Sequence, residues 1–205
     1  GLLDGVPATV KDLVDLAGFP TRRGSRTSSP DPVADDAPSV MGLKAAGAVI
    51  IGKTTTTEYG WKSPGDCPLH GITRNPWNLK EGSDGSSAGS CAATSAGLVA
   101  FALGTETYGS IVCPCDRRGV TGLRPTYGRV SRAGAMSLSW SMDKVGAIAR
   151  SVEDCALVFN AIYGPDGVDQ SVYDLPFNYD PRVKLKRLRI GYLKGDFEHE
   201  QGERK

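Results

Sequence analysis

Short apolar runs alternate with segments of helical character along most of the chain. The apolar and β-branched runs predict strands, which we place at residues 5–11, 48–51, 99–103 and 188–193. Segments bounded by capping residues, glycine or proline predict helices, which we place at residues 38–46, 90–96 and 151–163. This alternation favours an α/β fold with a mixed, largely parallel β-sheet core flanked by helices.

Residues at the ends of two predicted helices support them, and prolines between these helices predict a loop. Pro38 stands in the first turn of one helix and Gly47 ends it. Ser151 precedes the acidic Asp154 by three residues, which is the spacing of a capping box. After the second strand we expect a long polar loop, which contains Pro64, Pro68 and Pro76.

The length and charge of the chain disfavour several classes of protein. A chain of 205 residues is long enough for one domain with a substantial core, and we predict a single domain over residues 1–205. The 24 basic residues nearly balance the 23 acidic ones, so the net charge is +1. Nothing in this balance favours direct binding to nucleic acid or to an anionic membrane. A neutral or small polar molecule is the better candidate for the substrate.

The cysteines and the ends of the chain refine this picture. Five cysteines, an odd number without a dense framework, favour a reducing, cytoplasmic setting. Cys113 and Cys115 are too closely spaced for the usual zinc knuckle and no histidine is near them in the sequence, so we expect no metal. No apolar run approaches the roughly 18 residues of a membrane span. Because the chain starts without methionine, directly at a strand-like segment, we expect a fragment of a longer protein.

Two loops rich in glycine and serine, residues 85–90 and 104–110, carry the candidate chemistry. A serine nucleophile needs a base to take its proton and backbone N–H donors for the developing oxyanion. The two histidines are poor candidates for the base, because His70 lies in a proline-flanked loop and His199 lies close to the chain end. A buried lysine is an alternative base, and Lys11 follows an apolar strand. From the residues themselves, a solvated Lys11 and structural turns at both loops remain open.

Six segments of the chain recur together in one known pattern of order and spacing. They are residues 5–12, 52–54, 74–77, 85–90, 104–111 and 122–130. Together they resemble the amidase signature family, and the resemblance covers nearly the whole chain. It implies the amidase fold, an incomplete version of it at this length, and an activity towards linear carboxamides without metal or organic cofactor.

The resemblance also implies a role for each site residue. Ser110 matches the nucleophile, Ser86 matches the bridging serine that follows a cis peptide bond, and Lys11 matches the base. The backbone N–H groups of the preceding loop match the oxyanion hole, which consists of Thr107, Tyr108, Gly109 and Ser110. Ser87 and Glu106 are candidate supporting residues, Ser87 through a hydrogen bond to the proton relay.

The chain departs from the family pattern at several positions. Glu106 stands where aspartate is usual, Tyr108 replaces a glycine, and Val112 occupies the usual position of an arginine. Tyr108 is therefore expected to narrow the acyl pocket or to stiffen its loop. We interpret Trp61, Trp77 and Trp140 as packing residues, with the stretch from Ser139 to Met142 as an alternative pocket wall.

Three functions are compatible with this sequence. The first is an amidase that hydrolyses a small linear amide to a carboxylate and ammonia or an amine through an acyl-Ser110 intermediate. The second is the amidase subunit of a tRNA-dependent amidotransferase, in which a partner subunit would contact the RNA. The third is a non-catalytic amidase-like binding domain, closed by Tyr108. An isolated core of this kind exposes apolar edges, which favours a homo-oligomer.

Overall fold

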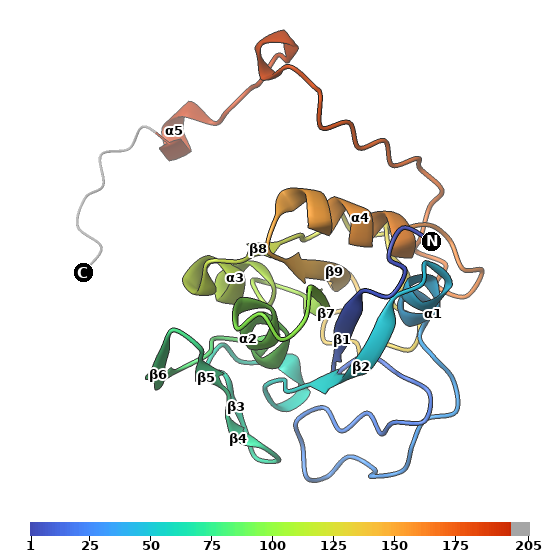
Figure 1. Ribbon diagram of the computed structural model, residues 1–205, viewed down its shortest axis with the longest axis vertical. Coiled ribbons are helices and arrows are strands. Elements are labelled where there is room, and N and C mark those ends of the chain that lie inside the picture. The colour runs from blue at the N-terminus through green and yellow to red at the C-terminus, as the bar shows by residue number, and fades with distance from the viewer. Residues whose placement is uncertain (198–205) are drawn as a thin grey trace.

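The computed structural model describes residues 1–197 and is built around one five-stranded β-sheet (Figure 1). In spatial order the strands are β2 (Val49–Thr54), β1 (Pro7–Lys11), β7 (Phe101–Glu106), β9 (Lys144–Ala149) and β8 (Thr121–Gly122). β1 pairs in parallel with β2 and β7, whereas β9 is antiparallel to both β7 and β8. The predicted mixed α/β sheet is confirmed, with its parallel pairings confined to β2, β1 and β7.

Helices cover both faces of this sheet (Figure 1). The main helices are α1 (Pro38–Ala45), α2 (Ala88–Ser95), α3 (Val112–Arg118) and α4 (Val152–Ile162). On β9, Val145 and Ala147 join the core cluster of α1 and α4, whereas Ile148 joins the cluster of α2 and α3. Successive side chains of a strand point to opposite faces. The sheet is therefore buried between two layers, α1 with α4 and α2 with α3.

The predicted strands before residue 104 and all three predicted helices are present, with ends that differ by at most three residues. The capping box is also confirmed, because the Ser151 hydroxyl accepts a hydrogen bond from the Asp154 N–H at 3.0 Å. The predicted polar loop contains more structure than expected. It forms a 3₁₀ turn and two small hairpins, with the elements η1 (Glu58–Gly60), β3 (Asp66–Cys67), β4 (Gly71–Ile72), β5 (Arg74–Asn75) and β6 (Asn78–Gly82).

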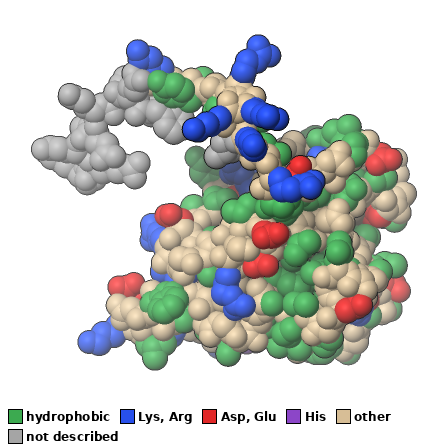
Figure 2. Space-filling model, turned by 45° about the horizontal axis from the view of Figure 1, so that its top comes forward, with side chains coloured by type: hydrophobic (Ala, Val, Ile, Leu, Met, Phe, Trp, Pro, Cys, Tyr) green, Lys and Arg blue, Asp and Glu red, His purple; other side chains and the backbone are tan. Residues whose placement is uncertain are grey.

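The predicted strand at residues 188–193 is wrong. After Phe177, which still packs against the core, the chain runs away from the sheet, with η2 (Leu185–Arg187) and α5 (Lys194–Phe197) as its described regular elements. Lys and Arg side chains gather along it (Figures 1 and 2). Ile190 is 72% exposed, and no described strand pairs with this segment. An apolar run of this kind forms a strand only where a neighbouring strand pairs with it, and none of the described strands does so here. His199 and the rest of residues 198–205 lie outside the described residues.

The tryptophans are also placed differently from the prediction. Trp61, Trp77 and Trp140 are 68%, 73% and 78% exposed, so none of them is a core residue. Trp77 is held at the surface by a hydrogen bond from its indole N–H to the Arg118 carbonyl, at 3.0 Å.

Among the described helices, none has the length and the apolar composition needed to cross a membrane.

Candidate active site

The sheet brings the candidate base next to the two serine loops. Lys11 is the last residue of β1, and Glu106 is the last residue of the neighbouring parallel strand β7. The carboxyl ends of parallel strands lie at the same edge of a sheet, where α/β folds place their ligand sites. Ser86 and Ser87 lie just before α2, which contacts both β1 and β7. Three segments far apart in the sequence thus meet at one edge.

Lys11 is fully buried and hydrogen-bonded on several sides. Its Nζ lies 2.7 Å from Ser86 Oγ, 3.0 Å from Ser87 Oγ and 2.8 Å from Thr105 Oγ1, with the Thr105 carbonyl oxygen at 3.4 Å. Burial lowers the pKa of Lys11 from 10.5 to about 7, although the negative charges of Glu106 and Asp143 act in the opposite direction. A substantial fraction of Lys11 is therefore neutral, and able to accept a proton, near pH 7.

The hydrogen-bond directions indicate which serine this amine can serve. The Ser87 hydroxyl donates to the Thr105 carbonyl at 3.2 Å, so its oxygen accepts an N–H from Lys11. The Thr105 carbonyl accepts only. In the neutral amine these two acceptors occupy the two N–H donors and leave the lone pair to the hydroxyls of Ser86 at 2.7 Å and Thr105 at 2.8 Å, of which Ser86 lies nearer to Nζ. Lys11 is therefore placed to take the Ser86 proton.

Ser86 and Ser87 are fixed by the backbone around them. The peptide bond between Gly85 and Ser86 is cis. The Ser86 carbonyl accepts a hydrogen bond from the Thr56 hydroxyl at 3.1 Å, and the Ser87 N–H donates to the Ser110 carbonyl at 3.1 Å. The second bond joins the two serine loops directly.

Ser110 is half-buried beside these groups. No hydrogen bond joins its hydroxyl to that of Ser86 in the structure of residues 1–197. Catalytic hydrogen bonds in unliganded sites are often long and shorten when substrate binds. The helix α3 begins two residues after Ser110, at Val112.

The loop that was predicted to form the oxyanion hole curls around the Glu106 carboxylate. Glu106 is fully buried and accepts hydrogen bonds from the N–H groups of Gly109, Ile111 and Val112. The Gly109 N–H is therefore directed at Glu106 and not at the cavity. Among the described residues, the N–H groups of Thr107, Tyr108 and Ser110 donate to no protein acceptor, which leaves them available to a ligand.

Position 109 also requires glycine. Its φ of +118° lies in the region that L side chains rarely adopt, and a Cβ there would lie 2.6 Å from Cys113 Sγ. The neighbouring Tyr108 side chain is 91% exposed. It extends towards solvent and does not close the site, although the residue lines the cavity beside Ser110.

Two cavities meet at this edge of the sheet. One, of about 280 Å³, is lined by Ser86, Thr105 and Thr107 and by apolar side chains that include Leu13, Met136 and Trp140. The other, also about 280 Å³, is lined by Ser110, with Ser63, Tyr108 and Cys113. Gly60, Thr107 and Leu138 line both. Ser86 thus lines one cavity and Ser110 lines the neighbouring one.

The structure adds two site residues that the sequence did not indicate. Thr105 contacts Lys11 Nζ with both its hydroxyl and its carbonyl, and it lies within the second serine loop. Asp143 accepts hydrogen bonds from the Thr107 hydroxyl at 2.5 Å and from the Leu138 and Ser139 N–H groups at 2.6 and 2.9 Å. Its contact with Thr107 joins positions 36 residues apart, so no local pattern predicts it.

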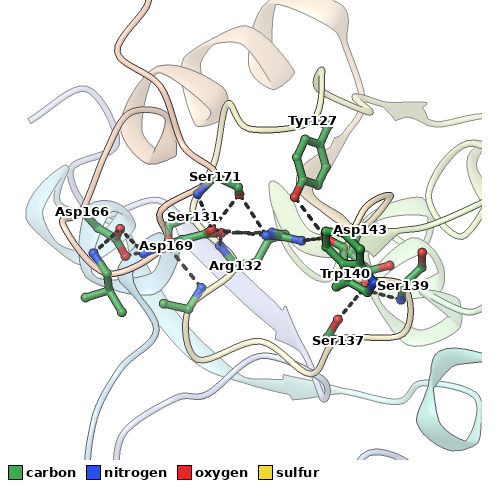
Figure 3. A network of polar contacts seen from close by, with 12 residues as sticks. Tyr127, Ser131, Arg132, Ser137, Ser139, Trp140, Asp143, Asp166, Asp169 and Ser171 are labelled. Carbon is green, nitrogen blue, oxygen red and sulfur yellow. Dashed lines mark hydrogen bonds and ion pairs between the residues drawn. The ribbon is translucent and has the colours of Figure 1, made fainter.

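A polar network forms the far wall of the first cavity (Figure 3). Arg132 Nε lies 3.0 Å from Asp169 Oδ2, and Arg132 Nη2 lies 3.2 Å from Asp169 Oδ1 and 2.9 Å from Ser171 Oγ. The guanidinium also lies 4.8 Å from the Tyr127 ring centre and donates to the Trp140 carbonyl. Partial burial raises the pKa of Asp169, but the bonds from Arg132 and Ser171 outweigh it and hold that pKa well below 3.8. The ion pair thus fastens the segment after α4 to the cavity.

Asp169→Asn is expected to lower the free energy of unfolding by about 2 kcal/mol at pH 7, because it removes a charged partner of Arg132. The native pKa of Asp169 is depressed, so its contribution is present above pH 4 and is lost as the pH falls below that value. The difference between variant and wild type should therefore shrink on acidification, as measured by urea unfolding. Asp35→Asn, at an exposed position, is the matched control; equal effects of the two variants would contradict this role.

No group of three or more His, Cys, Asp or Glu side chains suited to a metal ion occurs in residues 1–197. Cys113 is exposed whereas Cys115 is buried. His70 is exposed, and its backbone N–H donates a hydrogen bond to Cys67 Sγ.

The chain is similar in sequence and in structure to several known proteins. The chain is 46% identical over 195 residues to a glutamyl-tRNA(Gln) amidotransferase subunit of Symbiobacterium thermophilum, and the match covers 93% of this chain and 40% of that protein. It superimposes on the peptide amidase of Stenotrophomonas maltophilia with a TM-score of 0.81 and 41% identity, covering 86% of this chain and 37% of the amidase. For the corresponding glutamyl-tRNA(Gln) amidotransferase subunit of Thermotoga maritima the TM-score is 0.82 at 38% identity, over 84% of this chain and 38% of the other.

The chain therefore spans about two fifths of the length of its relatives. The match to the amidase family itself extends over residues 1–204. With an alignment of this extent and relatives at this identity, the chain belongs to the amidase family.

Proposed function

We propose that this chain carries the catalytic core of an amidase, which hydrolyses a linear carboxamide to a carboxylate and ammonia or an amine. The observation that carries the proposal is the contact of 2.7 Å between Lys11 Nζ and Ser86 Oγ, at a fully buried lysine whose pKa is lowered to about 7. A buried amine without a carboxylate partner is costly to keep in a structural role. It is suited to accepting a proton from a hydroxyl near neutral pH.

In the acylation step, Ser110 Oγ attacks the amide carbon while its proton passes to Ser86 Oγ, and the Ser86 proton passes to Lys11 Nζ. The carbonyl oxygen becomes an oxyanion, which the free N–H groups of Thr107, Tyr108 and Ser110 stabilise. The C–N bond then breaks, and the proton returns from Lys11 through Ser86 to the leaving nitrogen.

Deacylation repeats the sequence with water. Water attacks the acyl carbon and gives its proton to the relay, the bond between the carbon and Ser110 Oγ breaks, and Ser110 regains a proton. For both steps the Ser110 hydroxyl must approach Ser86, and we expect substrate binding to bring them into hydrogen-bond distance.

The first test is the intact mass of the complete protein after exposure to a fluorophosphonate, which reacts with an activated serine and needs no knowledge of the substrate. We expect one adduct on the wild type and on Ser63→Ala, and none on Ser110→Ala. Ser63 is the matched control because its side chain is exposed and lines the same cavity as Ser110. An adduct that persists in Ser110→Ala, or no adduct on the folded wild type, would contradict the proposal.

The second candidate is the amidase subunit of a tRNA-dependent amidotransferase. It is favoured by glutamyl-tRNA(Gln) amidotransferase subunits that are 39% to 46% identical to this chain. The two candidates share the acyl-serine chemistry and differ in what accompanies it. Copurification of the complete protein with a second subunit, together with amide transfer in place of free hydrolysis, would establish the amidotransferase.

The non-catalytic alternative rests on Tyr108 closing the site, and the 91% exposure of that side chain gives it no support. A reducing, cytoplasmic setting is consistent with all five cysteines being free. Nothing in the described site calls for a cofactor in this reaction, since the base, the relay and the oxyanion donors are protein groups.

A further inference from the structure

The Glu106 carboxylate accepts three backbone hydrogen bonds from the loop that contains Ser110. Its Oε2 lies 2.5 Å from the Ile111 nitrogen and 3.1 Å from the Val112 nitrogen, and its Oε1 accepts the Gly109 N–H. The three donors lie on both sides of Ser110 in the sequence. One carboxylate therefore fixes the backbone immediately before and immediately after the nucleophile.

The side chain is also wholly enclosed. Glu106 is 0% exposed, and the cation paired with it is Arg124, whose Nη1 lies 3.9 Å away and whose side chain is 51% exposed. Burying a carboxylate is costly unless it accepts hydrogen bonds. The loop N–H groups supply these bonds, so the geometry of the loop and the charge of Glu106 depend on each other.

We propose that Glu106 is a positioning residue that holds the turn from Gly109 to Val112 and thereby selects which N–H groups face the reacting carbonyl. By taking the Gly109 N–H, it leaves the oxyanion to the N–H groups of Thr107, Tyr108 and Ser110. This inference rests on the proposed amidase function. It extends that function by assigning the shape of the oxyanion hole to one buried side chain.

The same carboxylate acts on the other end of the relay through its charge. Lys11 is influenced by the negative charges of Glu106 and Asp143, both of which raise its pKa. Lys144, whose Nζ donates to the Thr107 carbonyl at 3.3 Å, and Arg124 are the cations on the same side. Removing the negative charge of Glu106 therefore lowers the Lys11 pKa. Shortening the side chain keeps this charge near Lys11 but moves the carboxylate away from the loop N–H groups.

Two variants separate these effects. Glu106→Gln keeps the length, but its amide nitrogen then faces an N–H group that had an acceptor. Glu106→Asp keeps the charge and is one methylene shorter. We expect both to slow fluorophosphonate labelling of Ser110 by about 100-fold, the typical cost of displacing a reacting group by about 1 Å. We expect the acid limb of the labelling rate to move to lower pH in Glu106→Gln and to stay in place in Glu106→Asp.

A measurement without catalysis accompanies the kinetics. In the amide NMR spectrum of the complete protein, the Ile111 and Val112 protons should lie far downfield, as donors to a carboxylate, and should move upfield in Glu106→Gln. Glu153→Gln, at an exposed position on α4, is the matched control for folding and for charge. Labelling, pH limb and amide shifts in Glu106→Gln that all equal those of Glu153→Gln would overturn the proposal.

The two proposals can fail separately. If wild-type Ser110 is not labelled, the proposed amidase function fails, while the amide shifts still report whether Glu106 holds the loop. If the wild type is labelled and the Glu106 variants behave like the control, only the positioning role fails.

Discussion

Lys11→Met is expected to reduce the acylation rate of Ser110 by about 10³-fold and, at the same time, to stabilise the protein. The loss follows from removing the only base that contacts Ser86 among the described residues, since general bases contribute about 10²- to 10⁴-fold. The gain follows from replacing a fully buried amine by an apolar side chain of similar shape. Active-site residues often have opposite effects on activity and stability.

The pH dependence of both effects follows from the Lys11 pKa of about 7. Only neutral Lys11 accepts a proton, so wild-type acylation should rise with pH through about 7 and level off above it. The unfolded chain binds this proton up to pH 10.5, and the folded chain releases it near 7. Between these values the unfolded state holds more protons, so wild-type stability rises with pH across this window.

The stabilisation by Lys11→Met should therefore be largest below pH 7 and should diminish as the pH rises towards 10. Thermal unfolding of both proteins between pH 6 and pH 9 measures it. Lys53→Met is the matched comparison, because Lys53 is also buried but lies 2.9 Å from Asp12 in an ion pair. Its removal leaves Asp12 unpaired and should destabilise the protein. If Lys11→Met destabilises as well, Lys11 is a structural residue.

The candidate triad could be predicted because its members lie in segments whose local sequence is informative. Lys11 ends an apolar strand, and Ser86 and Ser110 lie in glycine-rich loops next to a helix or a strand. The resemblance of six such segments to one family supplied the roles. The contact between Lys11 and Ser86 follows from the packing of α2, which begins two residues after Ser86, against β1 and β7.

The remaining features depend on contacts between distant parts of the chain. The Arg132–Asp169 pair joins positions 37 residues apart, and neither residue lies in a pattern that signals a partner. The hydrogen bonds of Glu106 depend on how the loop curls back on β7, which side-chain type does not specify. The apolar pattern at residues 188–193 predicts a strand correctly only where a neighbouring strand exists to receive it.

Ser86→Ala is expected to cost about as much acylation rate as Lys11→Met, on the order of 10³-fold, because it interrupts the same proton path. The double variant Lys11→Met with Ser86→Ala should then be hardly slower than either single variant, since residues that act as one unit give strongly non-additive losses. The rates of fluorophosphonate labelling of the wild type, the two single variants and the double variant form a double-mutant cycle that measures this.

Ser87→Ala provides the matched control for this cycle. Ser87 Oγ lies 3.0 Å from Lys11 Nζ, close to the 2.7 Å of Ser86 Oγ, but it donates to the Thr105 carbonyl and so stands outside the proton path. Ser87→Ala should lower the acylation rate less than Ser86→Ala does. In a double variant with Lys11→Met, its effect on the free energy of unfolding should add to that of Lys11→Met. Two independent, additive losses for Lys11 and Ser86 would mean that they do not form a relay, and the base for Ser110 would then have to be sought elsewhere.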